Sequence, residues 1–321
     1  TGSFAGRPVA WPLIMSISFA MFGLCNKIAL YTSSFLGALS SFAVFFFSWF
    51  VSGSRKAGLA AAFLFAILPL NIIWSGAAHT DAASQFLVIL SAAAVVFYVR
   101  YPTPAALMAA FACMAFTSQA RIENYMYAAL LPAFVFILEP GLLRRHFRFF
   151  LAGGLLFILL SAPNFFNVVP PQFTTDWYEA HGVAQGGDHL SLSNLFNNLR
   201  DYGPHIFSSK YHPAAFSLLC LAGALYLARR NPRAFLTATV WIAALALLHF
   251  TRIFHIEQGR TRFFMQFYPA TILFASFGLL LLYDAIKSPF GKTASTAVLL
   301  AAALALAFSF RPYILEYSNQ Y

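Results

Sequence analysis

The sequence has little charge of either sign, few carboxylates and almost no cysteine. Only 9% of its 321 residues are charged, and Asp and Glu together number 10, whereas about a quarter of the residues in an average soluble domain are charged. This scarcity excludes an ordinary water-soluble domain. Cys25, Cys113 and Cys220 lie in apolar runs without metal-ligand spacing, so we expect small buried side chains and neither a disulfide framework nor a zinc site.

The residues that are abundant are apolar and aromatic. Hydrophobic residues make up 60% of the chain, aromatic residues 18% with 38 Phe among them, and the mean hydropathy is +0.71. This composition predicts an integral, multi-pass membrane protein with membrane lipids as its neighbours. The net charge of +10 does not indicate a nucleic-acid partner, because the basic residues occur in twos and threes between apolar runs.

Long apolar runs divide the chain into candidate membrane helices. Residues 9–24 are apolar but short, with a proline near their start, and are typical of an interfacial helix. Ten further runs follow, at 28–53, 59–78, 82–99, 105–120, 122–138, 149–163, 214–228, 235–250, 263–283 and 294–310. We therefore expect an all-α, polytopic transmembrane bundle of about ten spans plus the interfacial helix, since helices satisfy their own backbone in lipid.

The runs suggest four parts of the chain. These are an outer juxtamembrane segment with the interfacial helix at 1–27, a first helix group at 28–163, a long extracytoplasmic loop at 164–213, and a second helix group with a short outer tail at 214–321. The loop is rich in turn-forming residues and carries one amphipathic stretch with Leu192, Leu195, Phe196 and Leu199 on one face. This stretch could lie on the membrane surface and close over a site; the alternative is a disordered connector.

The basic residues orient the predicted bundle. Alternate loops hold Arg55, Lys56, Arg100, Arg144, Arg145, Arg148, Arg229, Arg230, Arg233, Lys287 and Lys292, and the positive-inside rule makes these loops cytoplasmic. The other side nevertheless has nine cations: Arg7, Lys27, Arg121, Arg200, Lys210, Arg252, Arg260, Arg262 and Arg311. This excess indicates an outward-facing site for an anionic ligand; the alternative is that they anchor the chain at lipid headgroups.

One polar hinge, His79-Thr80-Asp81, lies between two apolar runs. A carboxylate held between membrane spans is costly unless it faces water, a partner or a cavity, so Asp81 is a candidate functional residue. His79 and Asp81, with His255 and Glu257 further along, supply ligand types for a divalent metal ion, although no close-spaced motif fixes the pairing. A simple solvated loop end is the alternative.

Four stretches carry a family resemblance. They are Phe4-Ala5-Gly6-Arg7-Pro8-Val9-Ala10 followed by Met21-Phe22-Gly23; the hinge from Pro69 to Asp81; Ser118-Gln119-Ala120-Arg121; and Arg262-Phe263 followed by Pro269. With these four stretches in this order, the chain resembles the GT-C membrane glycosyltransferases. Within that superfamily it is similar to the protein O-mannosyltransferases (glycosyltransferase family 39) and the lipid A aminoarabinose transferases.

The resemblance implies an activity and roles for individual residues. It implies inverting transfer of a sugar from a polyprenyl-phosphate donor to a hydroxyl of a lipid, protein or glycan acceptor, on the periplasmic side of a bacterial inner membrane. Arg7, Arg121 and Arg262 would bind the donor phosphate, with Arg260 as a helper, and Asp81 would be a second acid that orients the acceptor or a neighbouring cation. His79, Glu123, His255 and Glu257 would contact the substrate.

The resemblance also raises a difficulty about the catalytic base. In the family the catalytic aspartate lies in the first outer loop after a first transmembrane helix, and both would precede Thr1. We therefore expect either a fragment or an inactive relative that serves as a membrane scaffold. A transporter or flippase for an anionic lipid is a further alternative, although the internal repeats or paired broken spans typical of transporters are not visible.

Overall fold

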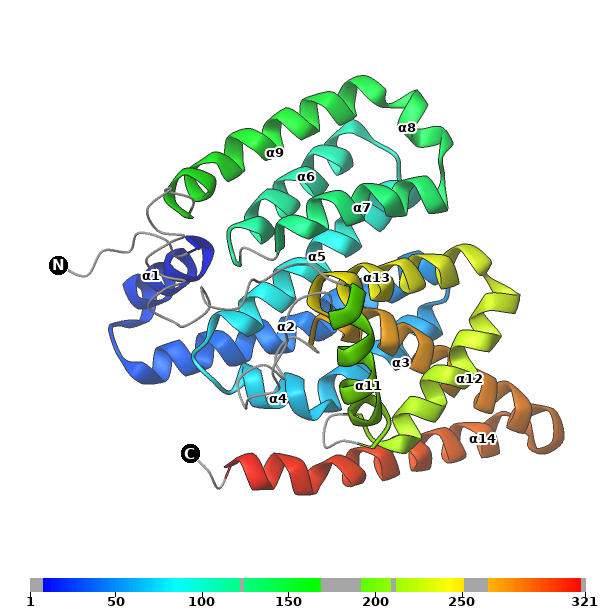
Figure 1. Ribbon diagram of the computed structural model, residues 1–321. Helices are drawn as coiled ribbons and strands as arrows, with labels where there is room; N and C mark the ends of the chain where they lie inside the picture. The colour runs from blue at the N-terminus through cyan, green and yellow to red at the C-terminus, as the bar shows by residue number, and fades with distance from the viewer. Residues whose placement is uncertain (1–7, 122–123, 169–191, 209–211, 251–264, 319–321) are drawn as a thin grey trace.

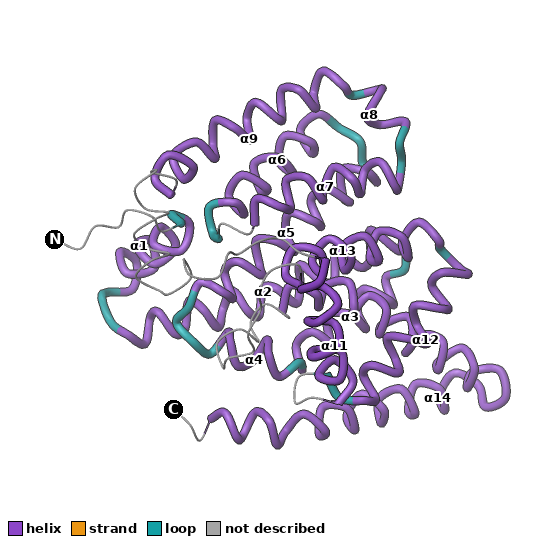
Figure 2. Tube along the Cα trace, in the orientation of Figure 1, coloured by secondary structure: helices purple, strands orange, loops and turns teal. Residues whose placement is uncertain are grey.

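A computed structural model describes residues 8–121, 124–168, 192–208, 212–250 and 265–318. Over these ranges the regular secondary structure is entirely helical, which confirms the all-α prediction (Figures 1 and 2). The helices are α1 (Ala10–Phe22), α2 (Asn26–Ser52), α3 (Arg55–Ile67), α4 (Pro69–Ser75), α5 (Thr80–Arg100), α6 (Pro104–Ser118), α7 (Tyr125–Leu138), α8 (Gly141–Arg145), α9 (Phe147–Val168), α11 (Leu192–Ser208), α12 (Ala214–Arg230), α13 (Pro232–Phe250) and α14 (Tyr268–Ser318). Each of the ten predicted apolar runs overlaps a helix, and the run 59–78 is divided between α3 and α4.

Only some of the described helices have the length and apolarity of a membrane span. In the described ranges, four helical segments are long and apolar enough to cross a membrane, at Asn26–Ser52, Thr80–Arg100, Met265–Lys287 and Thr293–Arg311, and the bent pair α3–α4 makes a fifth if it counts as one span. In the other apolar helices, the part with described side chains is 10–17 residues long, which is below the ~20 residues that a crossing usually takes. The chain is thus a helical membrane protein, and its described residues contain four to five spans by length and composition.

The helix ends gather at two opposite ends of the bundle. One, which we call the basic end, contains the turns after α2, α5 and α7 and the turn between α12 and α13 (Figure 1). Hydrogen bonds join these turns: Arg100 donates to the Phe50 carbonyl at 3.0 Å, Asn231 to the Ser52 carbonyl at 3.4 Å, and Arg233 to the Leu138 carbonyl at 2.8 Å. Cations from distant parts of the sequence therefore share one end of the molecule.

The opposite end, which we call the site end, contains α1, α4 and the α6–α7 connection (Figure 1). Here the Ala10 amide donates to the Gln119 carbonyl at 2.9 Å, and the Gln119 side chain donates to the Leu160 carbonyl at 2.7 Å. Among the described turns, predicted cytoplasmic and predicted outer turns thus lie at separate ends. Cys25 also lies here, between α1 and α2, and is exposed rather than buried as the sequence suggested.

The hinge that the sequence singled out begins with a helix break at Pro69. Leu68 is extended (ψ 127°), and α3 and α4 meet at a bend of 60°, because proline lacks an amide hydrogen and disfavours helical geometry in the residue before it. The redirected chain is fastened to α2, where Ser33 donates to the Ala77 carbonyl at 2.6 Å and Ser34 to the Ser75 carbonyl at 3.1 Å. These bonds fix the approach to α5.

Two glycines allow α12 and the first segment of α14 to pack backbone against backbone. A Cβ at Gly223 would lie 1.8 Å from the Phe274 carbonyl oxygen, and one at Gly278 would lie 2.3 Å from the Leu219 carbonyl oxygen. Small residues permit close helix approach in membranes, where association depends on van der Waals packing more than on the hydrophobic effect. The second helix group is therefore held together by a contact that only glycine permits.

The predicted amphipathic stretch forms the start of α11, but its apolar side faces outward. Leu192 and Phe196 are 67% and 69% exposed, whereas the polar Asn198 is 7% exposed. A helix that turns apolar side chains away from the protein suits a membrane surface. The assignment of 164–213 to a single loop region stays a prediction, since residues 169–191 and 209–211 lie outside the described part and α9 continues to Val168.

Candidate functional site

Asp81 lies in the first turn of α5, at the site end, and its side chain is only 5% exposed. The amino terminus of a helix carries partial positive charge, which favours a carboxylate there. Ser84 and Gln85 follow at the i+3 and i+4 positions and are likewise buried. One face of α5 therefore presents three buried polar side chains within its first two turns.

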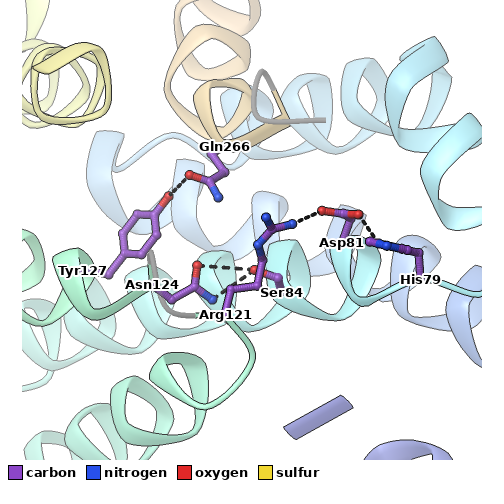
Figure 3. A network of polar contacts seen from close by, with 7 residues as sticks. All are labelled: His79, Asp81, Ser84, Arg121, Asn124, Tyr127 and Gln266. Atoms are coloured by element: carbon purple, nitrogen blue, oxygen red, sulfur yellow. Dashed lines mark hydrogen bonds and ion pairs between the residues drawn. The ribbon is translucent and has the colours of Figure 1, made fainter. Parts of the chain in front are cut away.

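Arg121 and His79 both contact the Asp81 carboxylate. The Arg121 guanidinium donates through Nη1 to Oδ1 of Asp81, and Nδ1 of His79 contacts Oδ2 (Figure 3). The Arg121 side chain is 11% exposed and that of His79 is 44% exposed. The cluster is thus a buried ion pair with an imidazole at its solvent-facing edge.

The connection that carries Arg121 is fixed by the side chain of Asn124. Asn124 is buried, and its Nδ2 donates to Oγ of Ser84 at 2.9 Å and to the Thr117 carbonyl at 2.9 Å. Figure 3 shows Asn124 and Arg121 reaching from the same connection toward α5. A single amide therefore ties the α6–α7 connection both to α6 and to α5, and this sets the position of Arg121.

A second set of bonds attaches the start of α14 to the same region. The Tyr127 hydroxyl donates to Oε1 of Gln266 at 3.3 Å (Figure 3), and the Trp241 indole donates to the Gln266 carbonyl at 2.8 Å. Gln85 donates through Nε2 to the Met265 carbonyl at 3.1 Å. Residues immediately after 251–264 are therefore held beside α5, α7 and α13.

Two buried polar atoms in this region are unpaired within the described residues. They are Oε1 of Gln85, whose side chain is 4% exposed, and Nε1 of Trp74, whose ring centroid lies 6.0 Å from that of His79. Buried polar atoms normally have a hydrogen-bond partner. The acceptor on Gln85 and the donor on Trp74 are consequently available to water or to a bound molecule.

His212 borders the start of α14 on its other side. Its ring lies against Phe216 and Tyr268, with centroids 4.6 and 5.9 Å away, and Nδ1 is 3.1 Å from Oγ of Ser217. Desolvation lowers the pKa of His212 to about 4, because burial disfavours the charged imidazolium. The ring is neutral at physiological pH and adds no positive charge to this end.

The structure brings together three of the predicted site residues and leaves the others undetermined. His79, Asp81 and Arg121 form one cluster although 40 residues separate Asp81 from Arg121. Arg7, Glu123, His255, Glu257, Arg260 and Arg262 lie outside the described residues, so their predicted roles stay predictions. Sequence reasoning missed the polar residues Ser84, Gln85, Asn124, Tyr127 and Gln266. The spacing of Ser84 and Gln85 after Asp81 was the available signal for two of them.

The described residues supply two of the four ligands predicted for a divalent metal ion, His79 and Asp81. His79 and Asp81 touch, but no group of three or more His, Cys, Asp or Glu side chains forms a metal-ligand set within the described ranges. The Arg121 guanidinium also places a positive charge on the Asp81 carboxylate. These residues alone do not fit a metal ion, and His255 and Glu257 are not described.

Comparison with solved structures shows the class of fold to which this bundle is similar. It is the fold found in ArnT and in the archaeal oligosaccharyltransferase AglB. No protein-family model matches the sequence, and a search of curated proteins finds no match. The similarity is thus one of tertiary structure.

Three solved structures illustrate it. ArnT from Cupriavidus metallidurans matches with TM-scores of 0.61 in the apo state and 0.60 when bound to undecaprenyl phosphate, at 14% and 15% identity, over 98% of this chain and 61% of that one. The oligosaccharyltransferase AglB from Archaeoglobus fulgidus, in complex with an inhibitory peptide and a dolichol-phosphate, matches with a TM-score of 0.63 and 14% identity, over 99% of this chain and 48% of that one. The chain therefore spans 61% of the length of ArnT and 48% of that of AglB.

Proposed function

We propose that the chain is an integral membrane glycosyltransferase that moves a sugar from a polyprenyl-phosphate donor to an acceptor hydroxyl, with inversion at the anomeric carbon. The observation that carries the proposal is the buried Arg121–Asp81 pair at one end of a GT-C-like bundle. The bound molecules of the similar structures, undecaprenyl phosphate and dolichol-phosphate, support a lipid-linked phosphate as the donor.

The chemistry of this reaction requires cations near the phosphate. The acceptor oxygen forms a bond to the anomeric carbon, the bond from that carbon to the phosphate oxygen breaks, and the electron pair leaves on the polyprenyl phosphate. The acceptor proton passes to a carboxylate. Guanidinium groups aimed at the phosphate stabilise the charge that develops there, and they match its oxygens with a planar fork.

We assign Arg121 to the donor phosphate and Asp81 to the positioning of Arg121. The carboxylate of Asp81 contacts both Arg121 and His79, so it holds the guanidinium in place at the site end. Both carboxylate oxygens of Asp81 are engaged in these contacts, which favours an orienting role over proton abstraction. Arg7, Arg262 and Arg260 would add positive charge, and Glu123, His79, His255 and Glu257 would contact the sugar or acceptor.

The orientation of the protein is part of the proposal. The basic end collects Arg100 and Arg233 along with other loop cations, and the positive-inside rule makes that end cytoplasmic. The site end then faces outward, which for a bacterial inner membrane is the periplasm. Membrane lipids surround the bundle, and no nucleic acid is involved.

The proposal is tested by transfer assays on the full-length protein in proteoliposomes, with a panel of polyprenyl-phosphate sugars. Arg121→Ala and Arg262→Ala should each lower turnover, by about 10²–10³-fold for one lost charge-stabilising donor, while the protein remains folded. The turnover of Arg121→Lys should lie between that of the alanine variants and that of the wild type, because lysine keeps the positive charge but lacks the planar guanidinium fork.

A matched control is available at the basic end. Arg230 pairs with Asp284 at 3.3 Å and is 60% exposed, so Arg230→Ala should leave turnover unchanged. Normal turnover by both Arg121→Ala and Arg262→Ala would remove the phosphate-binding role. Absence of transfer by the wild type with every donor would favour the scaffold or the lipid transporter.

A further inference from the structure

A second candidate site lies away from the Asp81–Arg121 cluster, between α3 and the two segments of α14. It is a groove of about 330 Å³, open on one side, which is at the lower end of the range for small-molecule sites, about 300–1,000 Å³. Its walls are apolar, with Leu59, Phe63, Leu280 and Leu300 among the lining residues. The polar side chains that line it are Lys56 and Tyr283.

The groove exists because α14 reverses direction and its second segment packs loosely. Gly291 adopts φ 77° in the turn between the segments, a conformation that glycine reaches without steric cost, and Figure 1 shows the second segment running back along the bundle. Of the 18 most apolar consecutive residues in each segment, 22% are buried in Thr293–Arg311, compared with 56% in Met265–Lys287. The small side chains of Ala60 and Ala303 leave the space between them open.

The groove begins at the basic end, where aromatic rings and cations pair. Nζ of Lys56 lies 5.2 Å from the centroid of the Tyr283 ring, and Cζ of Arg55 lies 4.7 Å from that of Trp49. Tryptophan and tyrosine concentrate at the level of the lipid headgroups, and lysines near helix ends extend to the same level. The mouth of the groove is therefore placed at the headgroups and its length among the acyl chains.

We propose that this groove binds an acyl chain of an anionic phospholipid, with the lipid phosphate on Lys56. The groove is complementary to such a lipid, because a cation lies at its mouth and an apolar channel lies behind it. These features match an amphiphile with one negative headgroup and a hydrocarbon tail. The surrounding bilayer supplies such a molecule. The site lies at the opposite end of the bundle from Arg121 and does not depend on the glycosyltransferase proposal.

The experiment is native mass spectrometry of the purified chain in detergent, titrated with phosphatidylglycerol or phosphatidylcholine. Phosphatidylglycerol should bind preferentially to the wild type. Lys56→Gln should weaken its binding about fivefold, the effect of one lysine at a membrane surface, without changing the binding of phosphatidylcholine. Ala60→Phe should fill the groove and abolish binding of both lipids, and Ala303→Phe does the same from the opposite wall.

Arg55→Gln is the matched control, because Arg55 precedes Lys56 but packs over Trp49 and does not line the groove. It should leave phosphatidylglycerol binding unchanged. The proposal is overturned if the two lipids bind equally, if Arg55→Gln and Lys56→Gln weaken binding alike, or if both groove-filling variants retain the lipid. Displacement of phosphatidylglycerol by undecaprenyl phosphate at equal concentration would also overturn it, because the groove would then hold a polyprenyl tail.

Discussion

The strongest prediction concerns the charge on Asp81. Asp81→Asn keeps the size of the side chain and one acceptor oxygen but removes the negative charge, so the Arg121 guanidinium, only 11% exposed, loses its compensating carboxylate. Breaking a buried ion pair by removing one partner costs about 3–5 kcal/mol. We expect a loss of about 3 kcal/mol in the free energy of unfolding, at the low end because asparagine still accepts a hydrogen bond.

The assay is a double-mutant cycle with Arg121→Gln, measured by chemical unfolding in mixed micelles. The free energy of unfolding of the Asp81→Asn/Arg121→Gln double variant should be about 2 kcal/mol higher than the sum of the two single losses predicts. The reason is that neither partner is left unpaired in the double variant. The exposed pair Arg230–Asp284, with side chains 60% and 46% exposed, is the control. Asp284→Asn there should cost less than about 1 kcal/mol.

Two results would refute this reasoning. If the effects of Asp81→Asn and Arg121→Gln add without coupling, the two side chains do not stabilise one another. If Asp81→Asn is as mild as Asp284→Asn, the carboxylate is not buried against a cation. Either result would also remove the basis for assigning Asp81 as the residue that positions Arg121.

The remaining predictions concern orientation and packing. In a cysteine-free background, a cysteine at exposed Ala78 near Asp81 should react with a membrane-impermeant maleimide from outside the cell, and one at exposed Ala105 only after permeabilisation; the reverse pattern would overturn the topology. Gly223→Ala should lower stability by about 1–3 kcal/mol, the usual cost of overpacking, because its Cβ would lie 1.8 Å from a carbonyl oxygen. Gly154→Ala, with nothing within 4 Å of its Cβ, should not destabilise the protein in the same unfolding assay, and equal losses would contradict the close α12–α14 contact.

The helical segments of this protein could be predicted from the sequence because their signal is local. Apolar runs without charge form helices in lipid, where every backbone amide and carbonyl must find an internal partner. The break at Pro69 was less certain, since the run 59–78 is continuous in hydropathy, and the structure divides it into α3 and α4. The number of crossings stays a prediction beyond the four to five that the described residues support, because the shorter apolar helices have the composition of a span without its usual length.

The candidate site was only partly predictable, because its residues are distant in the chain. Asp81 and His79 could be singled out from their place between two apolar runs, and Arg121 from its place in an outer turn. That Arg121 meets the Asp81 carboxylate depends on the packing of α5, α6 and α7. Asn124, which fixes the Arg121 connection, carries no sequence signal of this role.

The amino-acid sequence by itself determined that this chain is a helical membrane protein whose basic and mixed-charge turns alternate, because hydropathy and charge act over a few residues. Only the tertiary structure decided which cation neutralises Asp81 and where α14 leaves a groove beside Lys56. The physical reason is that ion pairs and grooves are formed between helices, and the packing of helices depends on side-chain shapes that no single stretch of sequence contains.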